Sequence, residues 1–328
     1  MRIDELTTPA LVVDAAALDH NLATMTQAVG ARLRPHVKAH KCTALARRQA
    51  EHGARMFTCA TIREVEGLAA AGLREDLLLA NEVLDASRLA KVDARVTVAV
   101  DSEATVDAAV RAGVKEVLID IDVGVPRCGI PAEAASELAE YTRRAGLEVR
   151  GVMGYEGHVV LITDRETRAQ LTEEAMKQLL DAHDAAGGEV ISGGATGTYD
   201  INTWANEIQA GSYALMDTAY AELGLPFQQA LHVLATVISV SPKGHAVVNA
   251  GLKAFGMDHG KPAMLDGHEP FIVSDEHISF FPGQPVHLGD RLKLIPAHID
   301  PTVAYHERIH LIEGEDVLDT WEVDLRGW

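Results

Sequence analysis

The sequence predicts a (β/α)8 barrel, classed as α/β, followed by a mostly antiparallel β domain. Between about residue 32 and residue 217, short β-branched runs alternate with helical stretches, which is the pattern of a parallel sheet built from βα units. After about residue 227 the pattern changes to short or alternating apolar runs separated by Gly, Pro and Asp turns. A chain of 328 residues has the length for one barrel and one further domain.

Eight apolar runs are predicted to form the strands of the barrel. They cover residues 32–38, 55–60, 76–81, 95–101, 116–122, 147–154, 189–193 and 207–210. Segments with apolar residues at helical spacing lie between them, at residues 61–71, 103–112, 132–145 and 165–186. Eight such units favour a closed barrel over an open doubly wound sheet, and the first strand–helix turn lacks the glycine fingerprint of a nucleotide-binding sheet.

The second domain is predicted from five later strands and one early strand. The later strands cover residues 231–240, 244–250, 291–296, 308–312 and 317–325. The early strand, at residues 10–14, precedes the first helix of the barrel and is expected to pair into the second domain. The predicted division is a barrel at residues 15–228 and a β domain made of residues 1–14 and 229–328.

The composition excludes several classes of partner. The chain has 29 Lys and Arg against 48 Asp and Glu, a formal net charge of −19, so it repels nucleic acid backbones and anionic membrane surfaces. No apolar run approaches the roughly 20 residues of a membrane helix, and the first residues lack a signal-peptide pattern. The three cysteines have no metal-like spacing and suit a reducing compartment. We therefore expect a cytoplasmic protein that acts on small molecules.

Several chemically capable residues follow the predicted strands at their C-terminal ends, where the active site of a barrel lies. Lys38 ends the first strand, either as a solvated lysine or as a Schiff-base lysine whose amine is made nucleophilic by its surroundings. Arg127 follows the fifth strand, and an ordinary ion pair in a loop is its alternative interpretation. Tyr155 and His158 follow the sixth strand in the segment GYEGH at residues 154–158.

Two donor-rich segments follow the seventh and eighth strands. Residues 192–199 (SGGATGTY) place Thr198 among glycines whose backbone N–H groups can face an anion. Gly211, Ser212 and Tyr213 open a predicted helix and add a second set of donors. A strand-end lysine together with two anion-binding segments suggests a cofactor that carries a phosphate and an aldehyde.

His298 and Asp300 form the candidate metal pair. If the backbone is extended at residues 296–303 (PAHIDPTV), the two side chains leave the same face and can bind one cation. A histidine with a carboxylate suits Zn²⁺, Mn²⁺ or Mg²⁺, with open positions for water and substrate. A solvated turn is the alternative for so short a motif. His259 and His268 lack such spacing and are interpreted as surface or core residues.

Seven motifs together resemble the fold-type III pyridoxal-phosphate (PLP) enzymes of the D-threonine aldolase and D-serine dehydratase family. They are TPALVVD at residues 8–14, RPHVKAHK at 34–41, DVGVPRCG at 122–129, GYEGH at 154–158, GATGTY at 194–199, GSY at 211–213 and HxD at 298–300. The resemblance runs nearly end to end. It implies an alanine racemase-like barrel with a C-terminal β domain, working as a homodimer.

The resemblance also implies how PLP would be bound. Lys38 matches the lysine that forms the Schiff base with the cofactor. Arg127 matches an arginine near the cofactor ring and its phenolic oxygen, and Tyr155 matches an aromatic residue beside the ring. The residues that lie in the family's phosphate-binding segments are Thr198, Gly211, Ser212 and Tyr213.

The metal pair indicates which reaction the family resemblance implies. D-serine dehydratases of this family typically show His-x-Cys with Zn²⁺, whereas His298-x-Asp300 is similar to the aldolase branch. A carboxylate in place of a thiolate favours Mn²⁺ or Mg²⁺, although Zn²⁺ is also compatible. His158 is the nearest candidate for the catalytic base. The predicted reaction is cleavage of a D-β-hydroxy-α-amino acid, such as D-threonine or D-3-hydroxyaspartate, to glycine and an aldehyde.

Three other functions remain open at this point. The same residues could serve dehydration of D-serine or D-3-hydroxyaspartate to ammonia and an oxo acid. A non-catalytic protein of PLP homeostasis resembles the barrel but lacks the β domain and the metal pair. An amino-acid racemase would need no ion on the β-hydroxyl group, so its activity would survive chelation.

Overall fold

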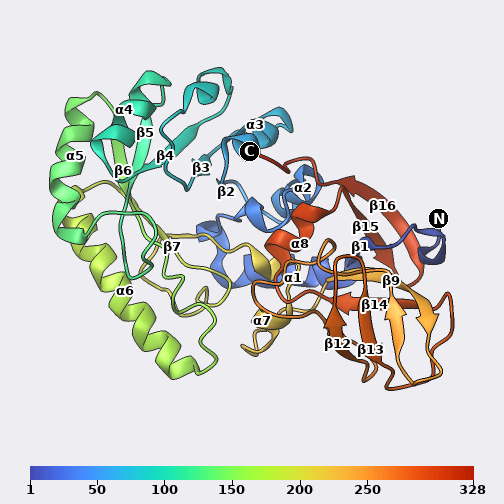
Figure 1. Cartoon of the computed structure of the whole chain (residues 1–328). Helices are drawn as coiled ribbons and strands as arrows, with labels where there is room; N and C mark the ends of the chain where they lie inside the picture. Colours follow the sequence, from blue (N-terminus) through green and yellow to red (C-terminus); the bar gives the residue numbers. More distant parts are fainter. The chain divides into compact units, whose positions relative to one another are not determined.

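In the computed structural model, which describes all 328 residues, the N-terminal pattern forms a parallel sheet of seven strands in chain order (Figure 1). The strands are β2 (Phe57–Cys59), β3 (Leu77–Leu79), β4 (Val96–Val100), β5 (Glu116–Asp120), β6 (Glu148–Met153), β7 (Val190–Gly193) and β8 (Glu207–Ile208). All three leucines of β3 are 0% exposed, and continuous apolar runs are typical of parallel strands covered on both faces. Seven of the eight predicted strands are thus confirmed.

Residues 33–36 close this sheet by hydrogen bonding to both of its edge strands. The N–H of Arg34 donates to the carbonyl of Ile208 at 2.9 Å, and the N–H of Thr58 donates to the carbonyl of Pro35 at 2.9 Å. Because Pro35 has no N–H, the segment pairs through isolated bridges rather than as a regular strand. It then turns into η3 (Val37–Ala39). The barrel prediction is confirmed, but its first strand ends earlier than predicted.

Four helices form where helical spacing predicted them, and two further helices precede them. They are α3 (Ile62–Ala70), α4 (Glu103–Arg111), α5 (Ala135–Arg144) and α6 (Arg165–Ala186), preceded by α1 (Ala15–Val29) and α2 (Thr43–Glu51). The start of α3 is a capping box, since the Thr61 side chain accepts the N–H of Glu64 and the Glu64 side chain accepts the N–H of Thr61. The barrel lacks a complete outer helical layer, because β3 and β4 are joined by the short η4 (Ser87–Lys91) and β7 and β8 by a loop.

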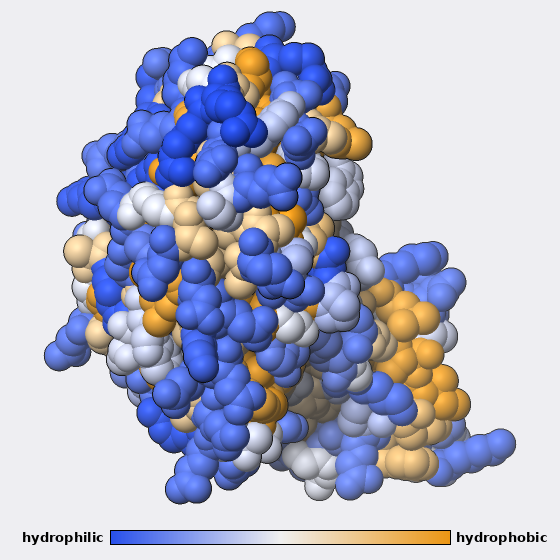
Figure 2. Space-filling model, turned by 90° about the vertical axis from the view of Figure 1, so that its left-hand side faces the viewer, coloured by the Kyte–Doolittle hydropathy of each residue, from blue (hydrophilic) through white to orange (hydrophobic).

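The outer helices of the barrel present a hydrophilic face. Figure 1 shows α4, α5 and α6 along the outside of the parallel sheet, and Figure 2 shows hydrophilic residues over most of the face seen from that side. The opposite side of α6 carries buried Met176 and Leu179, as expected for a helix that packs against a core. None of the helices combines the length and the apolarity needed to cross a membrane.

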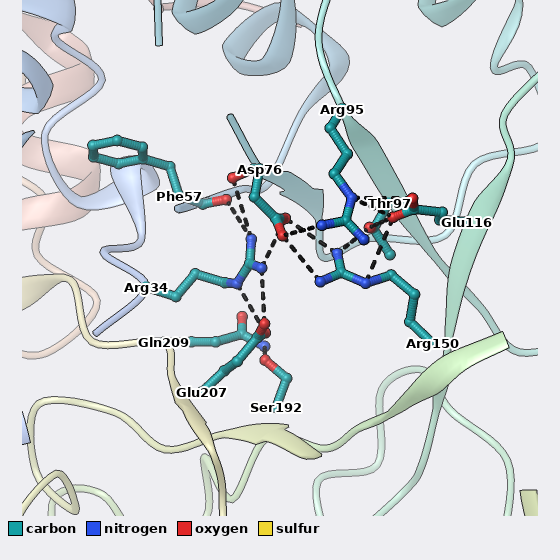
Figure 3. A network of polar contacts seen from close by, with 10 residues as sticks. All are labelled: Arg34, Phe57, Asp76, Arg95, Thr97, Glu116, Arg150, Ser192, Glu207 and Gln209. Atoms are coloured by element: carbon teal, nitrogen blue, oxygen red, sulfur yellow. Dashed lines mark hydrogen bonds and ion pairs between the residues drawn. The ribbon is translucent and has the colours of Figure 1, made fainter. Parts of the chain in front are cut away.

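Buried charges fill the barrel at the N-terminal ends of its strands (Figure 3). Arg34 and Arg150 are only 1% and 6% exposed. Arg34 donates to Asp76 and Glu207, each at 2.8 Å, and Arg150 donates to Asp76 at 2.9 Å. Burial opposes ionisation of Asp76, but the two guanidinium groups outweigh it, so the pKa of Asp76 lies below its usual value. The network is completed by Arg95, Thr97 and Glu116.

The second sheet is mixed and has nine strands. They are β1 (Ala10–Asp14), β9 (Leu231–Val240), β10 (Ala246–Val248), β11 (Ala263–Met264), β12 (Glu269–Val273), β13 (Ile278–Phe281), β14 (Arg291–Ile295), β15 (Arg308–Glu313) and β16 (Asp316–Glu322). β1 pairs antiparallel with β9 and parallel with β15, which confirms that the early strand joins this domain. The other pairs are antiparallel, as predicted.

Three strands and one helix were not predicted in this region: β11, β12, β13 and α8 (Ile299–Tyr305). β12 has no fully buried side chain, so the alternation that reveals a strand is missing. The chain divides into two compact units, made of Met1–Thr24, Ala39–Leu45 and Ser212–Asp324, and of Met25–Lys38, Ala46–Gly211 and Leu325–Trp328. The domain boundaries taken from the sequence stay a prediction.

Replacing Arg34 by methionine should destabilise the protein by about 3–5 kcal/mol, because it leaves Glu207 buried without its guanidinium partner and removes one of the guanidinium groups that neutralise Asp76. Urea unfolding at neutral pH measures the change. The matched control is Arg74→Met, which removes an exposed ion pair with Asp93 and should cost less than about 1 kcal/mol. Equal destabilisation by the two variants would contradict the role given to the buried network.

His232 on β9 should make stability fall between pH 6.5 and pH 4. Burial, with a contribution from Lys293, lowers the pKa of His232 from 6.5 to about 4. The unfolded chain therefore takes up a proton in this window before the folded chain does, and folding loses up to about 3 kcal/mol. His232→Gln should reduce this loss in urea unfolding, whereas exposed His287→Gln should not. An unchanged pH dependence in His232→Gln would refute the assignment.

Candidate functional site

The sequence-predicted residues of the barrel lie in the segments that follow its strands at their C-terminal ends. Lys38 is half-buried in η3, directly after the residues that close the sheet. Arg127 follows β5, Tyr155 and His158 follow β6, and Thr198 follows β7. This is the side of a barrel on which catalytic residues gather.

Arg127, Tyr155 and His158 are brought together by the loops after β5 and β6. The guanidinium carbon of Arg127 lies 5.5 Å from the centroid of the Tyr155 ring, a cation–π distance. A Cβ atom on Gly124 would lie 2.6 Å from Cε1 of His158, so the imidazole packs directly against the backbone of the β5 loop. The Arg127 guanidinium and the Tyr155 ring thus lie side by side, and the His158 imidazole lies against the loop that carries Arg127.

Three carboxyl groups beside these loops were not among the predicted site residues. Burial is the main reason that the pKa of Asp120 is raised well above its usual value, and the carboxylate of Glu82 adds to it. Ligand atoms of Glu82, Asp101 and Cys128 lie within 4.8 Å of one another, which is close enough for the three to hold one cation. Burial, reinforced by Glu82, raises the pKa of Cys128 to about 11. Its thiol is therefore protonated at neutral pH.

Glu156 organises the glycine-rich loop after β7. Its carboxylate is 0% exposed and accepts hydrogen bonds from the Gly194 N–H (3.1 Å), the Thr198 hydroxyl (2.8 Å) and the Asn202 amide (3.1 Å). The Thr198 hydroxyl in turn accepts the N–H of Ala195 at 3.0 Å. The Thr198 side chain therefore shapes the loop, and its hydroxyl proton is already donated within the protein.

The predicted residues after β8 form a short turn. Gly211 is buried, and Ser212 and Tyr213 belong to η6 (Ser212–Ala214). Tyr213 is 1% exposed, and its ring centroid lies 5.8 Å from that of Phe227. Ser212 is half-buried.

The metal pair lies at the start of α8, where the backbone is extended at His298 (φ −145°, ψ 120°), as expected, but helical from Ile299 onward. His298 is the N-cap residue of α8 and Asp300 lies in the first turn. A helix begins here because Pro301 fits the first turn, where its missing N–H is no loss, and because a carboxylate is favourable near a helix N-terminus. The two side chains still approach each other, with Nε2 of His298 3.9 Å from Oδ1 of Asp300.

Two residues that sequence reasoning missed adjoin His298. Nδ1 of His298 lies 2.7 Å from Oδ2 of Asp258. Burial opposes ionisation of Asp258, but the hydrogen bond to His298 outweighs it, so the pKa of Asp258 lies below its usual value. The rings of His259 and His298 stack with centroids 4.0 Å apart and planes 6° apart. Because 40 residues separate Asp258 from His298, no local pattern could reveal this contact.

Asp217 fixes the start of α8. It is 0% exposed, and its two carboxylate oxygens accept the N–H of Tyr220 at 3.0 Å and the N–H of Ile299 at 3.1 Å. Burial raises the pKa of Asp217 to about 6, although both hydrogen bonds oppose this. The contact with Ile299 holds the backbone between His298 and Asp300.

Comparison with known proteins shows the family of this chain. Residues 13–219 match the alanine racemase N-terminal domain, and residues 230–312 match a serine dehydratase domain. The D-threonine aldolase of an Arthrobacter species is 36% identical, with 98% of this chain and 93% of that protein covered. The chain belongs to the D-threonine aldolase family. This confirms the resemblance inferred from the motifs.

Further members support the same placement. A 3-hydroxy-D-aspartate aldolase of Paracoccus denitrificans (strain Pd 1222) is 32% identical over 98% of this chain and 93% of its own length. The crystal structure of a D-threonine aldolase from Filomicrobium marinum has a TM-score of 0.92 at 31% identity, covering 100% of this chain and 98% of that chain. A D-threo-3-hydroxyaspartate dehydratase from Delftia sp. HT23 has a TM-score of 0.89 at 28% identity, covering 100% of both chains.

Members of the D-threonine aldolase family are PLP-dependent lyases, and the residues of this chain fit the cofactor. Lys38 is half-buried and carries a primary amine, the group that condenses with an aldehyde. Arg127 and Tyr155, 5.5 Å apart, offer a cation and an aromatic face to a planar ring with an anionic oxygen. Ser212 is half-buried and carries a hydroxyl donor that suits a phosphate, whereas the N–H groups of Gly194 and Ala195 are already donated within the β7 loop.

Glu156→Gln should loosen the loop after β7, because the new amide group places donor hydrogens against the donors that now surround the carboxylate. We expect a loss of about 1–3 kcal/mol in stability and faster amide hydrogen exchange at residues 194–202. Glu166→Gln in the exposed first turn of α6 is the control and should change neither quantity. Unchanged exchange in the Glu156 variant would contradict the assignment.

Proposed function

We propose that the protein is a lyase that uses PLP and a divalent metal ion to cleave D-β-hydroxy-α-amino acids, of the D-threonine or D-3-hydroxyaspartate type, to glycine and an aldehyde. The observation that carries the proposal is the approach of His298 Nε2 and Asp300 Oδ1 to 3.9 Å in a chain that matches a D-threonine aldolase over nearly its full length. The carboxylate favours a hard ion, Mn²⁺ or Mg²⁺, over Zn²⁺.

The cofactor would be held by residues at the C-terminal ends of the barrel strands. Lys38 would bind its aldehyde, and Arg127 and Tyr155 would flank its ring. The residues that would surround its phosphate are Thr198, Gly211, Ser212 and Tyr213, with Thr198 contributing through the loop that it shapes rather than through its hydroxyl. When bound, PLP supplies a sink for the electron pair that remains when the Cα–Cβ bond breaks.

The acid–base work would fall to side chains of the protein. His298 and Asp300 would hold the metal ion, which supplies Lewis acidity to the β-hydroxyl group of the substrate. An imidazole nitrogen of His158 would take the proton of that hydroxyl group. The electron pair left on the oxygen forms the carbonyl group of the aldehyde as the carbon–carbon bond breaks.

Dehydration is the second candidate, and the match to the Delftia dehydratase favours keeping it. The same residues would then remove the α-proton and help hydroxide to leave, which yields ammonia and an oxo acid. Product analysis separates the two reactions. The protein, reconstituted with PLP and Mn²⁺, should convert D-threonine or D-3-hydroxyaspartate to glycine and an aldehyde. Ammonia as the main product would overturn the aldolase proposal.

Asp300→Ala should reduce cleavage at least about 100-fold, because the loss of a metal ligand should cost no less than the 10–100-fold typical of outer-shell partners. PLP absorbance should stay intact, since Lys38 is unchanged. Asp275→Ala, at an exposed residue of the same domain, is the control. Chelation should abolish wild-type activity. A D-amino acid racemisation that survives chelation, or full activity of Asp300→Ala, would contradict the role of the metal.

We further propose that the enzyme is a cytoplasmic homodimer. The location is supported by three free cysteines, of which Cys42 and Cys59 are buried, since unpaired thiols suit a reducing compartment. The dimer follows from the family resemblance alone.

A further inference from the structure

The two ring nitrogens of His298 each face a carboxylate, at very different distances. Nδ1 lies 2.7 Å from Oδ2 of Asp258, and Nε2 lies 3.9 Å from Oδ1 of Asp300. The shorter distance is that of a charge-assisted hydrogen bond. The longer distance exceeds that of a hydrogen bond. It is compatible with two ligand atoms that bind one ion at about 2.1 Å each, because such atoms are at most about 4.2 Å apart.

The two distances indicate that one ring nitrogen of His298 is a hydrogen-bond donor and the other carries a lone pair. A neutral imidazole carries its proton on one nitrogen and a lone pair on the other. If Nδ1–H donates to Asp258, the lone pair of Nε2 points to the side of Asp300. Histidine ligands of metals commonly donate their second N–H to a carboxylate, which fixes the tautomer and orients the ring.

The segment that carries Asp258 is attached to the helix that carries the metal pair. Gly256 forms an isolated antiparallel bridge with His298, and its N–H donates to the Thr302 hydroxyl at 3.0 Å. That hydroxyl donates to the carbonyl of His298 at 2.6 Å. A Cβ atom on Gly256 would lie 2.1 Å from Cγ of Pro301, so only glycine allows this approach. Gly256, two residues before Asp258, is therefore fixed against His298 and Pro301.

A competing arrangement would make His259 a metal ligand together with Asp258 and His298. Ligand atoms of Asp258, His259 and His298 lie within 4.8 Å of one another, so these three could themselves hold an ion. However, two ligands at right angles and about 2.1 Å from an ion are about 3.0 Å apart, and Nδ1 and Oδ2 are closer than that, at 2.7 Å. The parallel stacking of His259 on His298 suits a ring that shields the imidazole from water.

We propose that Asp258 is a positioning residue for the metal site. It accepts the Nδ1–H of His298 and so directs Nε2 toward an ion shared with Asp300, while His259 packs on the ring without binding the ion. The proposal rests on the proposed function for the presence of the ion, but the hydrogen bond and the tautomer belong to the metal-free protein as well.

The first test is metal affinity. Asp258→Ala in the PLP-loaded protein should weaken Mn²⁺ binding about 10–100-fold, measured by titration with electron paramagnetic resonance of free Mn²⁺. Saturating Mn²⁺ should restore activity, and PLP absorbance should not change. Asp258→Asn, which keeps an acceptor oxygen without the charge, should lose less of the Mn²⁺ affinity.

Two control variants should bind Mn²⁺ like the wild type: His259→Phe, which keeps the stacking, and Asp275→Ala. Wild-type affinity in Asp258→Ala, or a large loss in His259→Phe, overturns the proposal.

The second test needs no metal and separates this proposal from the proposed function. Nitrogen-15 spectra of the histidine rings in the metal-free protein should show His298 as the Nδ1–H tautomer, and Asp258→Ala should remove that preference. An Nε2–H tautomer in the wild type overturns the proposal even if the protein proves to be an aldolase. The expected tautomer supports it even if product analysis shows another reaction.

Discussion

The barrel depends on neutralising the charges that are buried at the N-terminal ends of its strands. Arg34, Asp76, Arg150 and Glu207 come from different strands or from the residues beside them, and each guanidinium joins carboxylates from at least one other strand. A buried charge without its partner costs several kcal/mol, so the strands must meet in one register. Because this side secures the barrel, the opposite ends of the strands are free to carry residues such as Lys38.

Carboxylates also accept hydrogen bonds and fix the backbone or side chains near the candidate reactive residues. Glu156 gathers the donors of the glycine-rich loop, Asp217 holds the backbone beside His298, and Asp258 accepts a ring N–H of His298. A chain with 48 acidic and 29 basic residues therefore does not use its acidic excess only for solubility. Part of that excess orients N–H groups inside the protein.

Much of the fold, and the residue types of the candidate site, could be predicted from the sequence alone. The strand Leu231–Val240 was predictable from its apolar residues, whereas the end of the first barrel strand was not, because Pro35 interrupts its hydrogen bonding. His298 and Asp300 could be chosen as the candidate metal pair from their residue types and their spacing. The extended backbone expected for both residues holds for His298 only, because Pro301 favours a helix start and Asp300 lies in the first turn of that helix. The contact between Asp258 and His298 could not be predicted from the sequence, because it forms only in the tertiary fold.

β1 lies between β9 and β15 in the mixed sheet, although it is the first strand of the chain and its two partners begin only at residues 231 and 308. During synthesis the ribosome releases β1 long before either partner exists. Both edges of the strand then remain open, and open strand edges are templates for unwanted pairing. Completion of this sheet is therefore a late event that must unite the two ends of the polypeptide after translation is almost finished, and contacts of such long sequence separation form slowly.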